Sequence, residues 1–333
     1  MQNRSFKAMI VEEKEEKNFT RRIGEKSVEE LPPGDVLIEV AYSSLNYKDA
    51  LSCIGNRGVT RRYPHTPGID AAGVVAHSDA PEVREGDEVL VTGYDLGMNT
   101  SGGFGRMIRV PADWVVPLPE GLTLRESMIY GTAGFTAALC VLHITDQGVE
   151  KDSGDVLVTG ATGGVGSMAT SMLARSGYRV AAVSGKSDRE AFLKRLGAAE
   201  VIAREEVMDE SAKPLLKGRW AAAVDTVGGD MLASVLKAAA LHAVVSACGN
   251  VAGFQLNTTV FPFILRGVRL MGADSANCPR KLRLRAWEKI ATDWKLPHLE
   301  EMTTEAALED LDPFIDDILQ AKISGRTLVR LTD

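Results

Sequence analysis

The sequence predicts an α/β protein that combines a β-rich domain with a doubly wound, parallel-sheet domain. Short apolar segments broken by glycine and proline fill the first third of the chain. From about residue 126, segments of strand type alternate with segments of helix type. A glycine-rich turn joins an apolar strand to an amphipathic helix at residues 156–173. The 333 residues suffice for two domains, because a domain typically has about 100–200 residues.

The β-rich part covers residues 1–126. Four apolar segments there have the length and punctuation of strands, at residues 6–11, 35–45, 73–78 and 87–93. Turn sequences such as PPGD and REGD precede two of them. Many short strands with this punctuation indicate a barrel-like or Greek-key β domain.

The alternating part covers residues 127–265. Strand signals recur at residues 156–160, 178–185, 200–204, 221–229 and 243–249. Between the first two strands, apolar residues follow helical spacing, at Val165, Met168, Ala169, Met172 and Leu173. Strand and helix alternation predicts βαβ units and a parallel sheet. Residues 266–333 add two helical segments and a final strand, which predicts a return to the first domain.

Composition and charge exclude several classes of protein. The net charge of −7 argues against nucleic-acid binding, which needs a basic surface. The four cysteines form no CxxC pair, so neither a structural zinc site nor a redox dithiol is expected. The N-terminal segment has no apolar run of signal-peptide length, and we expect a cytoplasmic protein. Residues 127–145 lack Asp, Glu, Lys and Arg, but their Gly, Thr and His content favours a buried helix over a membrane span.

The glycine-rich turn VTGATGGVGSMA is the strongest local motif. Its glycines Gly160, Gly163 and Gly166 recur at every third position, which differs from the common GxGxxG spacing. Glycine permits a tight turn and lets backbone amides at a helix N-terminus approach a pyrophosphate. The flanking strand and helix supply the required context, so we predict dinucleotide binding rather than an ordinary βα turn.

The end of the next strand predicts which dinucleotide binds. NAD-binding units place an acidic residue about 20 residues after the glycines to bind the ribose. Here Ser184, Gly185 and Lys186 stand at that place, and Arg204 follows the third strand. A hydroxyl and two cations attract a 2′-phosphate, whereas a carboxylate repels it. We predict NADPH as the cofactor, the alternative being that Lys186 and Arg204 are solvated loop charges.

Eight segments occur in an order that resembles a known family. They are SSLNYKDAL, PGIDAAG, GTAGFTAALCV, VTGATGGVG, VAAVSGK, DTVGGDMLA, FPFILRGVRLMGADS and GRTLV. Together they resemble the YhdH/YhfP-type quinone oxidoreductase group of the zinc-free medium-chain dehydrogenases/reductases, and within it the NADPH-dependent acrylyl-CoA reductases. The resemblance implies a GroES-like catalytic domain, a Rossmann domain, a homodimer, and hydride transfer from NADPH to an activated C=C bond.

The same resemblance implies roles for individual residues. It places Tyr47 beside the nicotinamide and the 2′-phosphate on Ser184, Gly185, Lys186 and Arg204. It also implies that Gly163, Gly164, Val165 and Gly166 bind the pyrophosphate. The remaining cofactor contacts that it implies are Thr132, Asn250, Ile264, Ser275 and Gln320. Asn250 departs from the apolar residue expected there, and the alignment at Gln320 is loose.

The resemblance also locates a missing metal site. Asn46-Tyr47 and Ile69-Asp70 stand where zinc-containing relatives carry a Cys ligand and a His-Glu pair. Without thiolate or imidazole ligands at these positions, no zinc site is expected. The five histidines of the chain show no ligand spacing either. We therefore predict that no metal takes part.

Without a metal, side chains must donate the proton and bind the substrate. Tyr47 is the candidate proton donor to a developing enolate, with solvent as the alternative donor and cofactor positioning as the alternative role. Arg57, Arg61 and Arg62 are candidates for the phosphates of a CoA ester, because a guanidinium donates two hydrogen bonds at once. They could equally be solvated loop charges, and a rival basic cluster lies at residues 280–285. Two other functions stay open: quinone or general enone reduction, and NADPH binding with little turnover.

Overall fold

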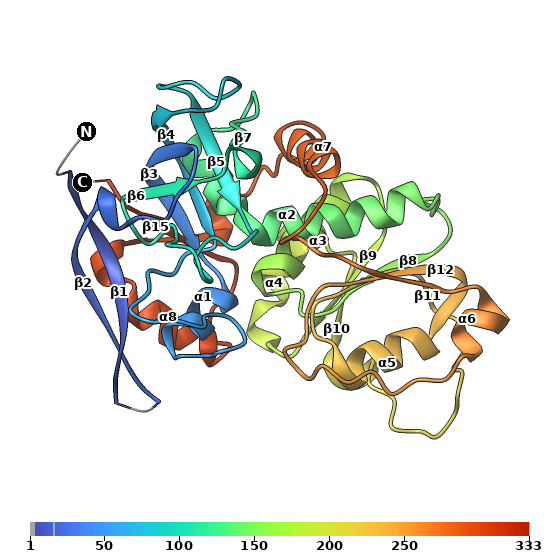
Figure 1. Ribbon diagram of the computed structural model, residues 1–333. Helices are drawn as coiled ribbons and strands as arrows, with labels where there is room; N and C mark the ends of the chain where they lie inside the picture. The colour runs from blue at the N-terminus through green and yellow to red at the C-terminus, as the bar shows by residue number, and fades with distance from the viewer. Residues whose placement is uncertain (1–3, 16, 333) are drawn as a thin grey trace. The chain divides into compact units, whose positions relative to one another are not determined.

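The computed structural model describes residues 4–15 and 17–332, and all side chains among them except that of Ser187. The described chain forms two compact units. The first comprises residues 4–132, 276–284 and 299–332, and the second comprises residues 133–275 and 285–298. Figure 1 shows the elements of both units. The predicted boundaries at 126/127 and 265/266 fall inside the helices Leu124–Asp146 and Phe261–Arg266.

The first unit is built from two sheets. A long antiparallel hairpin pairs β1 (Ser5–Glu15) with β2 (Asn18–Ser27). A seven-stranded sheet has the order β14-β15-β3-β4-β5-β7, with β6 pairing β3 beside this path. Its strands are β3 (Val36–Leu45), β4 (Asp70–Ser78), β5 (Glu88–Thr92), β6 (Met107–Val110), β7 (Val116–Pro117), β14 (Thr303–Ala307) and β15 (Arg326–Arg330). Antiparallel pairing of β15 with β3 brings the C-terminal segment back to the N-terminal part of the chain.

The second unit holds a six-stranded, fully parallel sheet of order β10-β9-β8-β11-β12-β13. The strands are β8 (Asp155–Val158), β9 (Val180–Ser184), β10 (Glu200–Ala203), β11 (Trp220–Asp225), β12 (Ala239–Ala247) and β13 (Arg269–Gly272). The helices are α3 (Gly164–Arg175), α4 (Glu190–Arg195), α5 (Gly229–Lys237) and α6 (Phe261–Arg266). The strand order reverses at β8, so the doubly wound sheet predicted from sequence is confirmed.

Two helices are shared between the units. Helix α2 (Leu124–Asp146) is long and apolar enough to cross a membrane, but 83% of its apolar window is buried in the protein, as a core helix requires. Gly131 interrupts it with φ 49° and ψ −155°. Helix α7 (Arg280–Ala291) also contributes to both units. The remaining helices are α1 (Tyr47–Cys53), α8 (Asp312–Leu319) and the short 3-10 turns at Val28–Glu30, Ala112–Trp114, Ser187–Arg189, Arg204–Glu206, Glu300–Met302 and Leu308–Asp310.

Each unit has its own apolar core. In the first, inward-facing residues of β3, β4 and β5 pack with apolar residues of β15 and α8. In the second, Trp220, Val235 and Leu236 are among the buried residues that pack α5 against the sheet. Burying one large apolar side chain stabilises a fold by about 1.5–3 kcal/mol. Two separate cores therefore give each unit a rigid frame for the loops at its sheet edge.

Candidate active site

The glycine-rich turn connects β8 to α3 in the second unit. Gly160 has φ 60°, and a Cβ there would lie 2.3 Å from Thr226 Oγ1. A Cβ on Gly166 would lie 2.3 Å from the carbonyl oxygen of Gly160. Glycine is therefore required at both positions, at the first for its backbone conformation and at both for close approach.

The start of α3 fits a pyrophosphate. Gly163 is the N-cap residue and offers no side chain to the helix amides. The first amides of a helix have no intrahelical acceptor, and the helix dipole favours an anion there. These donors and the space left by the glycines could hold a pyrophosphate, and its contacts with Gly163, Gly164, Val165 and Gly166 stay a prediction.

Strand register brings most of the predicted cofactor residues of this unit to one edge of the sheet. Val158 pairs with Ala182, and the amide of Ala161 donates to the carbonyl of Val183 at 3.0 Å. Ala203 pairs with Ser184, so Arg204 comes directly after Ser184's partner. Asn250 and Ser275 follow the carboxyl ends of β12 and β13, at the same edge. In doubly wound sheets this edge binds ligands where the strand order reverses.

The residues after β9 and β10 carry hydroxyl and cationic groups. Ser184 Oγ accepts a hydrogen bond from the amide of Lys186 at 2.9 Å, which orders the turn between them. Partial burial lowers the pKa of Lys186, as does nearby Arg189, while Asp188 opposes the shift. Arg204 is 63% exposed, and its Nε lies 3.5 Å from Glu205 Oε1. Positions 184–186 hold no carboxylate to compete with an anion.

A pocket that the sequence did not reveal adjoins Arg204. It has a volume of about 600 Å³, and four of its lining side chains are apolar, namely Met208, Val227, Met231 and Ala252. Glu205, Glu210 and Asp230 also line it. Such an apolar floor next to a cation suits a flat base attached to a charged ribose phosphate. Its lining comes from three separate stretches of chain, so no local motif could indicate it.

A buried carboxylate, also missed, locks the neighbouring turn. Asp225 at the end of β11 accepts hydrogen bonds from Thr159 Oγ1 at 2.7 Å and from the amide of Gly228 at 2.7 Å. Burial raises the pKa of Asp225, while these donors oppose the shift. Because Thr159 immediately precedes Gly160, Asp225 holds the turn after β11 against the glycine-rich turn.

In the first unit, the segment around Tyr47 begins helix α1. The side chain of Tyr47 is 41% exposed, whereas Asp49 is fully buried. The Asp49 carboxylate accepts from the amide of Asn46 at 2.8 Å and from the amides of Gly68 and Ile69 at 3.2 and 2.8 Å. It thereby ties the start of α1 to the PGID segment. Burial and the charge of Asp70 raise the pKa of Asp49 to about 7, against the effect of its hydrogen bonds.

A second buried carboxylate, Asp70, gathers donors from three segments. Its Oδ2 accepts from Ser44 Oγ at 2.5 Å, from Asn46 Nδ2 at 2.8 Å and from the amide of Thr132 at 2.9 Å. Its Oδ1 accepts from Thr132 Oγ1 at 2.5 Å. A Cβ on Gly131 would lie 2.5 Å from Oδ2, so the interruption in α2 needs glycine for this approach. The sequence indicated Asp70 only as a residue in the place of a zinc ligand.

Arg326 of β15 lies beside this centre. It is fully buried, and it donates to the carbonyls of Ile129 at 3.0 Å and Leu45 at 3.2 Å. Burial lowers the pKa of Arg326, while Asp70 and Asp49 act in the opposite direction. One buried cation therefore lies beside two buried carboxyl groups.

Ile264 is not brought to the cofactor edge of its own sheet. Its side chain is 68% exposed on α6, which leads into the amino end of β13. At the end of α6, Arg266 donates to the carbonyls of Leu216, Lys237 and Ala239, which precede or begin β11 and β12. The cofactor contact at Ile264 therefore stays a prediction. Gln320 lies in the first unit, exposed at the end of α8.

The three arginines of the predicted CoA segment have different roles. Arg57 pairs with Glu13, donates to the carbonyl of Arg61 at 2.8 Å and lies over the rings of Phe19 and Tyr63. This guanidinium holds the loop to the hairpin, and its contact with CoA stays a prediction. Arg61 and Arg62 are exposed.

The rival basic cluster is used by the fold. Arg280 donates to the carbonyls of Asp113 and Val115, and buried Arg283 donates to the carbonyl of Thr92 at 2.7 Å. Arg285 pairs with Asp146 at 2.6 Å. These interactions anchor α7, which leaves the segment with Arg61 and Arg62 as the better candidate for phosphate binding.

Two further features of the described residues bear on the site. Among residues 4–15 and 17–332, no group of three or more His, Cys, Asp or Glu side chains is arranged to hold a metal ion.

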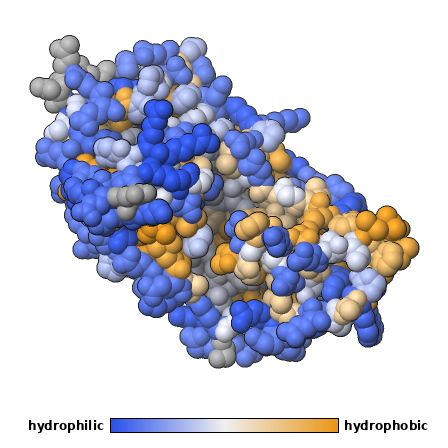
Figure 2. Space-filling view, turned by 60° about the horizontal axis from the view of Figure 1, so that its bottom comes forward, coloured by the Kyte–Doolittle hydropathy of each residue, from blue (hydrophilic) through white to orange (hydrophobic). Residues whose placement is uncertain are grey.

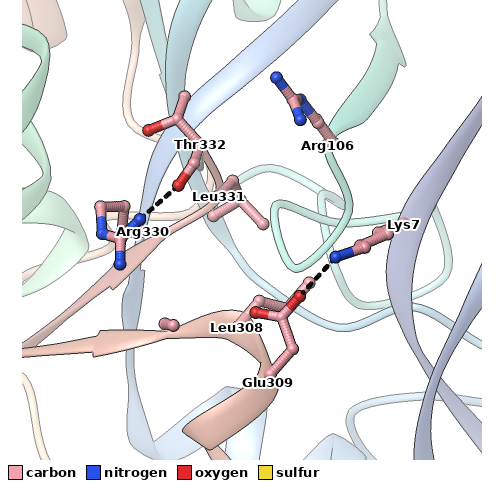
Figure 3. Close-up of a pocket in the computed structure, with 8 residues that line it drawn as sticks. Lys7, Arg106, Leu308, Glu309, Arg330, Leu331 and Thr332 are labelled. Carbon is pink, nitrogen blue, oxygen red and sulfur yellow. Dashed lines mark hydrogen bonds and ion pairs between the residues drawn. The ribbon is translucent and has the colours of Figure 1, made fainter.

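A pocket of about 200 Å³ in the first unit is lined by Lys7, Arg106 and Arg330, among others (Figure 3). Lys7 Nζ lies 3.1 Å from Glu309 Oε1, and Arg330 donates to the carbonyl of Thr332 at 2.6 Å. Its cations thus already serve the fold.

Comparison with known proteins gives one family match in each part of the chain. The alcohol dehydrogenase GroES-like domain family matches residues 32–120, and the zinc-binding dehydrogenase family matches residues 164–292. Acrylyl-CoA reductase AcuI of Ruegeria pomeroyi is 47% identical over 326 residues, which cover 97% of this chain and 98% of that protein. The chain belongs to the medium-chain dehydrogenase/reductase family. As a member of this family, the chain is an oxidoreductase.

Solved structures of other medium-chain dehydrogenases/reductases confirm the predicted combination of GroES-like and Rossmann domains. The yhdH oxidoreductase of Salmonella enterica, solved in complex with NADP, is 45% identical with a TM-score of 0.95, over 98% of this chain and 100% of that one. Bacillus subtilis protein yhfP, solved with NAD bound, is 45% identical with a TM-score of 0.96, over 99% of this chain and 100% of that one. The resemblance to the YhdH/YhfP-type group is therefore confirmed.

Proposed function

We propose that this chain reduces an activated C=C bond with NADPH, and that acrylyl-CoA is its substrate and propanoyl-CoA its product. The choice of NADPH rests on one edge of the parallel sheet. Ser184, Lys186 and Arg204 lie there at the ends of two adjacent strands, and positions 184–186 hold no carboxylate. The substrate rests on the similarity to AcuI of Ruegeria pomeroyi, which extends over nearly the whole chain.

Two groups of residues in the second unit would bind different parts of the cofactor. The amides at the start of α3 would bind the pyrophosphate, and Lys186 and Arg204 would bind the 2′-phosphate. The pocket beside Arg204 would take the adenine. When bound, NADPH supplies a hydride to the β-carbon of the substrate.

Polar groups of the first unit would stabilise the developing charge and donate the proton. The thioester carbonyl draws electron density from the C=C bond, and negative charge develops on its oxygen as the hydride adds. A proton must then reach the α-carbon. Tyr47 is the candidate donor, because its side chain is partly exposed at the start of α1. A donor aimed at the developing charge stabilises it without reorganisation.

A turnover assay tests the proposal. Purified protein is mixed with acrylyl-CoA and NADPH, and the loss of NADPH absorbance is followed. Turnover of acrylyl-CoA far above that of a small quinone supports the proposal. Faster quinone turnover supports general enone or quinone reduction, and tight NADPH binding without turnover supports a binding protein.

The CoA arm of the substrate provides a separate test. Arg61 and Arg62 are exposed in the loop that follows α1, the helix that begins at Tyr47. Their replacement by alanine should raise KM for acrylyl-CoA and leave KM for a small uncharged quinone unchanged. Added salt should act on the wild type in the same way, because exposed charge contacts are screened. Equal responses of both substrates would exclude this loop as a CoA site.

We also propose that two copies of the chain form a homodimer through the exposed edge of the parallel sheet. β13 is the last strand in the sheet order, and a free sheet edge can pair with another strand. Large apolar side chains are exposed beside it, on α6 and the adjoining strands: Val260, Phe261, Ile264, Leu265, Leu270 and Leu241. In Figure 2 a hydrophobic area lies at the right-hand side, where Figure 1 places α6.

Leu270→Asp should convert a dimer to a monomer in size-exclusion chromatography with light scattering, and a monomeric wild type would refute the proposal.

A further inference from the structure

Asp70 is unusual among the buried acidic residues because its carboxylate joins β3 to two segments that carry residues with proposed roles. Ser44 belongs to β3, Asn46 precedes the catalytic candidate Tyr47, and Thr132 is a predicted cofactor contact. All three donate to this one carboxylate, at 2.5–2.9 Å. Asp70 has 0% exposure, so water does not compete for these bonds.

Asn46 shows how the carboxylate reaches the catalytic segment. It is the N-cap residue of α1, a position at which the side chain of Asn usually accepts hydrogen bonds from the helix amides. Here its Nδ2 instead donates to Asp70 Oδ2 at 2.8 Å, and more distantly to Asp49 Oδ2 at 3.3 Å. The same Nδ2 also donates to the carbonyl of Ser44 at 3.2 Å, and its contact with Asp70 is the shortest of the three. The position of Tyr47, the first residue of the helix, follows that of Asn46.

Thr132 shows a second connection. Gly131 leaves helical geometry, so the amide of Thr132 needs an acceptor outside the helix. Asp70 Oδ2 provides it at 2.9 Å, while Oδ1 accepts from the Thr132 hydroxyl. One rigid carboxylate therefore fixes both the segment that carries Tyr47 and the segment that carries Thr132.

We propose that Asp70 is the positioning residue of the reaction, holding Asn46-Tyr47 and Thr132 in fixed relation through its buried carboxylate. It touches neither substrate nor reacting atoms; it acts through Asn46 and Thr132. This inference rests on the proposed function, in which Tyr47 serves the reduction. It assigns to a carboxylate the organising task that a bound metal ion performs in a metal-dependent active site.

The test uses Asp70→Asn, with Ser43→Ala as a matched control. The side-chain amide that Asp70→Asn introduces offers one acceptor oxygen in place of two, so Asn46 Nδ2 and both donors of Thr132 can no longer all be satisfied. Ser43 is also buried and also donates to Asp70, at 2.6 Å, but to its backbone carbonyl. Both variants lose hydrogen bonding between β3 and β4, and only the first alters the carboxylate.

Two readouts separate positioning from general stability. In the full-length protein, kcat with acrylyl-CoA should fall by roughly ten- to a hundredfold in Asp70→Asn, since small misplacements at a reacting centre have effects of that size. The Kd of NADPH, measured by fluorescence titration, should rise by a smaller factor than kcat falls, because the proposed pyrophosphate and 2′-phosphate contacts are not attached to Asp70. Ser43→Ala should keep the wild-type kcat. A kcat loss in Asp70→Asn no larger than in Ser43→Ala, or one matched by weaker NADPH binding, overturns the inference.

A second measurement does not depend on turnover. The chain has six tyrosines, and the ring signal of Tyr47 in ¹³C-tyrosine-labelled protein can be assigned with Tyr47→Phe. Asp70→Asn should shift or broaden this signal, and Ser43→Ala should leave it in place; an unchanged signal in Asp70→Asn refutes positioning. If Asp70→Asn does not fold, Asn46→Ala removes only the link to α1 and should give the same spectral change. An enzyme inactive toward acrylyl-CoA and quinone would refute the proposed function, while this spectrum would still decide the role of Asp70.

Discussion

The candidate site of the second unit uses backbone amides, whereas that of the first unit uses side chains. In the second unit, the glycine-rich turn presents backbone amides at the start of α3, and glycines are needed only for space and backbone conformation. In the first unit, side chains converge on the carboxylates of Asp49 and Asp70. A backbone site tolerates changes in side-chain chemistry but no added volume. A carboxylate centre is sensitive to a single change of charge, because buried donors lose their acceptor.

The largest effect is expected from volume in the glycine-rich turn. Gly166→Ala places a Cβ 2.3 Å from the carbonyl oxygen of Gly160, and the turn must move. NADPH affinity should fall by about a hundredfold, in line with an overpacking cost of roughly 1–3 kcal/mol. Gly163→Ala meets the same oxygen at 3.3 Å and should lose less. Isothermal titration measures both; equal losses would show that the turn does not select by volume.

Charge at the same sheet edge should have the next largest effect. The double change Lys186→Ala, Arg204→Ala removes the cations proposed to bind the 2′-phosphate. A lost charge-assisted hydrogen bond costs about 1.5–3 kcal/mol, so NADPH binding should weaken by at least about tenfold. NADH lacks the phosphate, and its Kd should not change. If both cofactors lose affinity alike, these residues shape the loop and do not read the phosphate.

A smaller, pH-dependent effect is expected in the carboxylate centre. The folded-state pKa of Asp49 is about 7 against an ordinary 3.8, so between these values the folded protein holds a proton that the unfolded chain releases. The free energy of unfolding should therefore fall as pH rises from about 4 to 7, by up to about 1.4 kcal/mol per pH unit.

Asp49→Asn removes this titrating group, although Asp70 and Arg326 remain beside it. Urea unfolding at pH 5 and pH 8 should show a loss of stability in the wild type that is smaller in the variant, by about 1–3 kcal/mol. Parallel pH profiles of the two proteins would place the pKa of Asp49 near its ordinary value.

Removal of metal should have no effect. The positions Asn46, Tyr47, Ile69 and Asp70 offer no thiolate or imidazole, so the first unit should act without an ion. Dialysis against a strong chelator should leave the rate of NADPH oxidation unchanged. Activity that is lost on dialysis and restored by zinc would show that the carboxylate centre serves a metal after all.

Several elements were predictable because their signals are local. The strand and helix periods of residues 156–173 and the composition of residues 127–145 indicated β8, α3 and a buried α2. Strand β2 was not indicated, because its sequence NFTRRIGEKS is largely polar and no residue of it is fully buried. It pairs with β1, and this pairing, not the burial of an alternating face, defines the strand. The structural role of Arg57 was equally hidden, since Glu13 and Phe19 lie far from it along the chain.

The sequence by itself determined the dinucleotide half of this protein, apart from the pocket beside Arg204 and the contacts of Asp225. The turn at Gly160–Gly166 and the residues 184–186 are contiguous, and their meaning depends on backbone geometry within a few residues. Only the tertiary structure decided the other half. Asn46 and Thr132 stand 24 and 62 residues from Asp70, and they meet it because β3, β4 and the first part of α2, up to Thr132, lie together in the first unit. A buried carboxylate draws its donors from whatever packs around it, and that packing is a property of the folded chain.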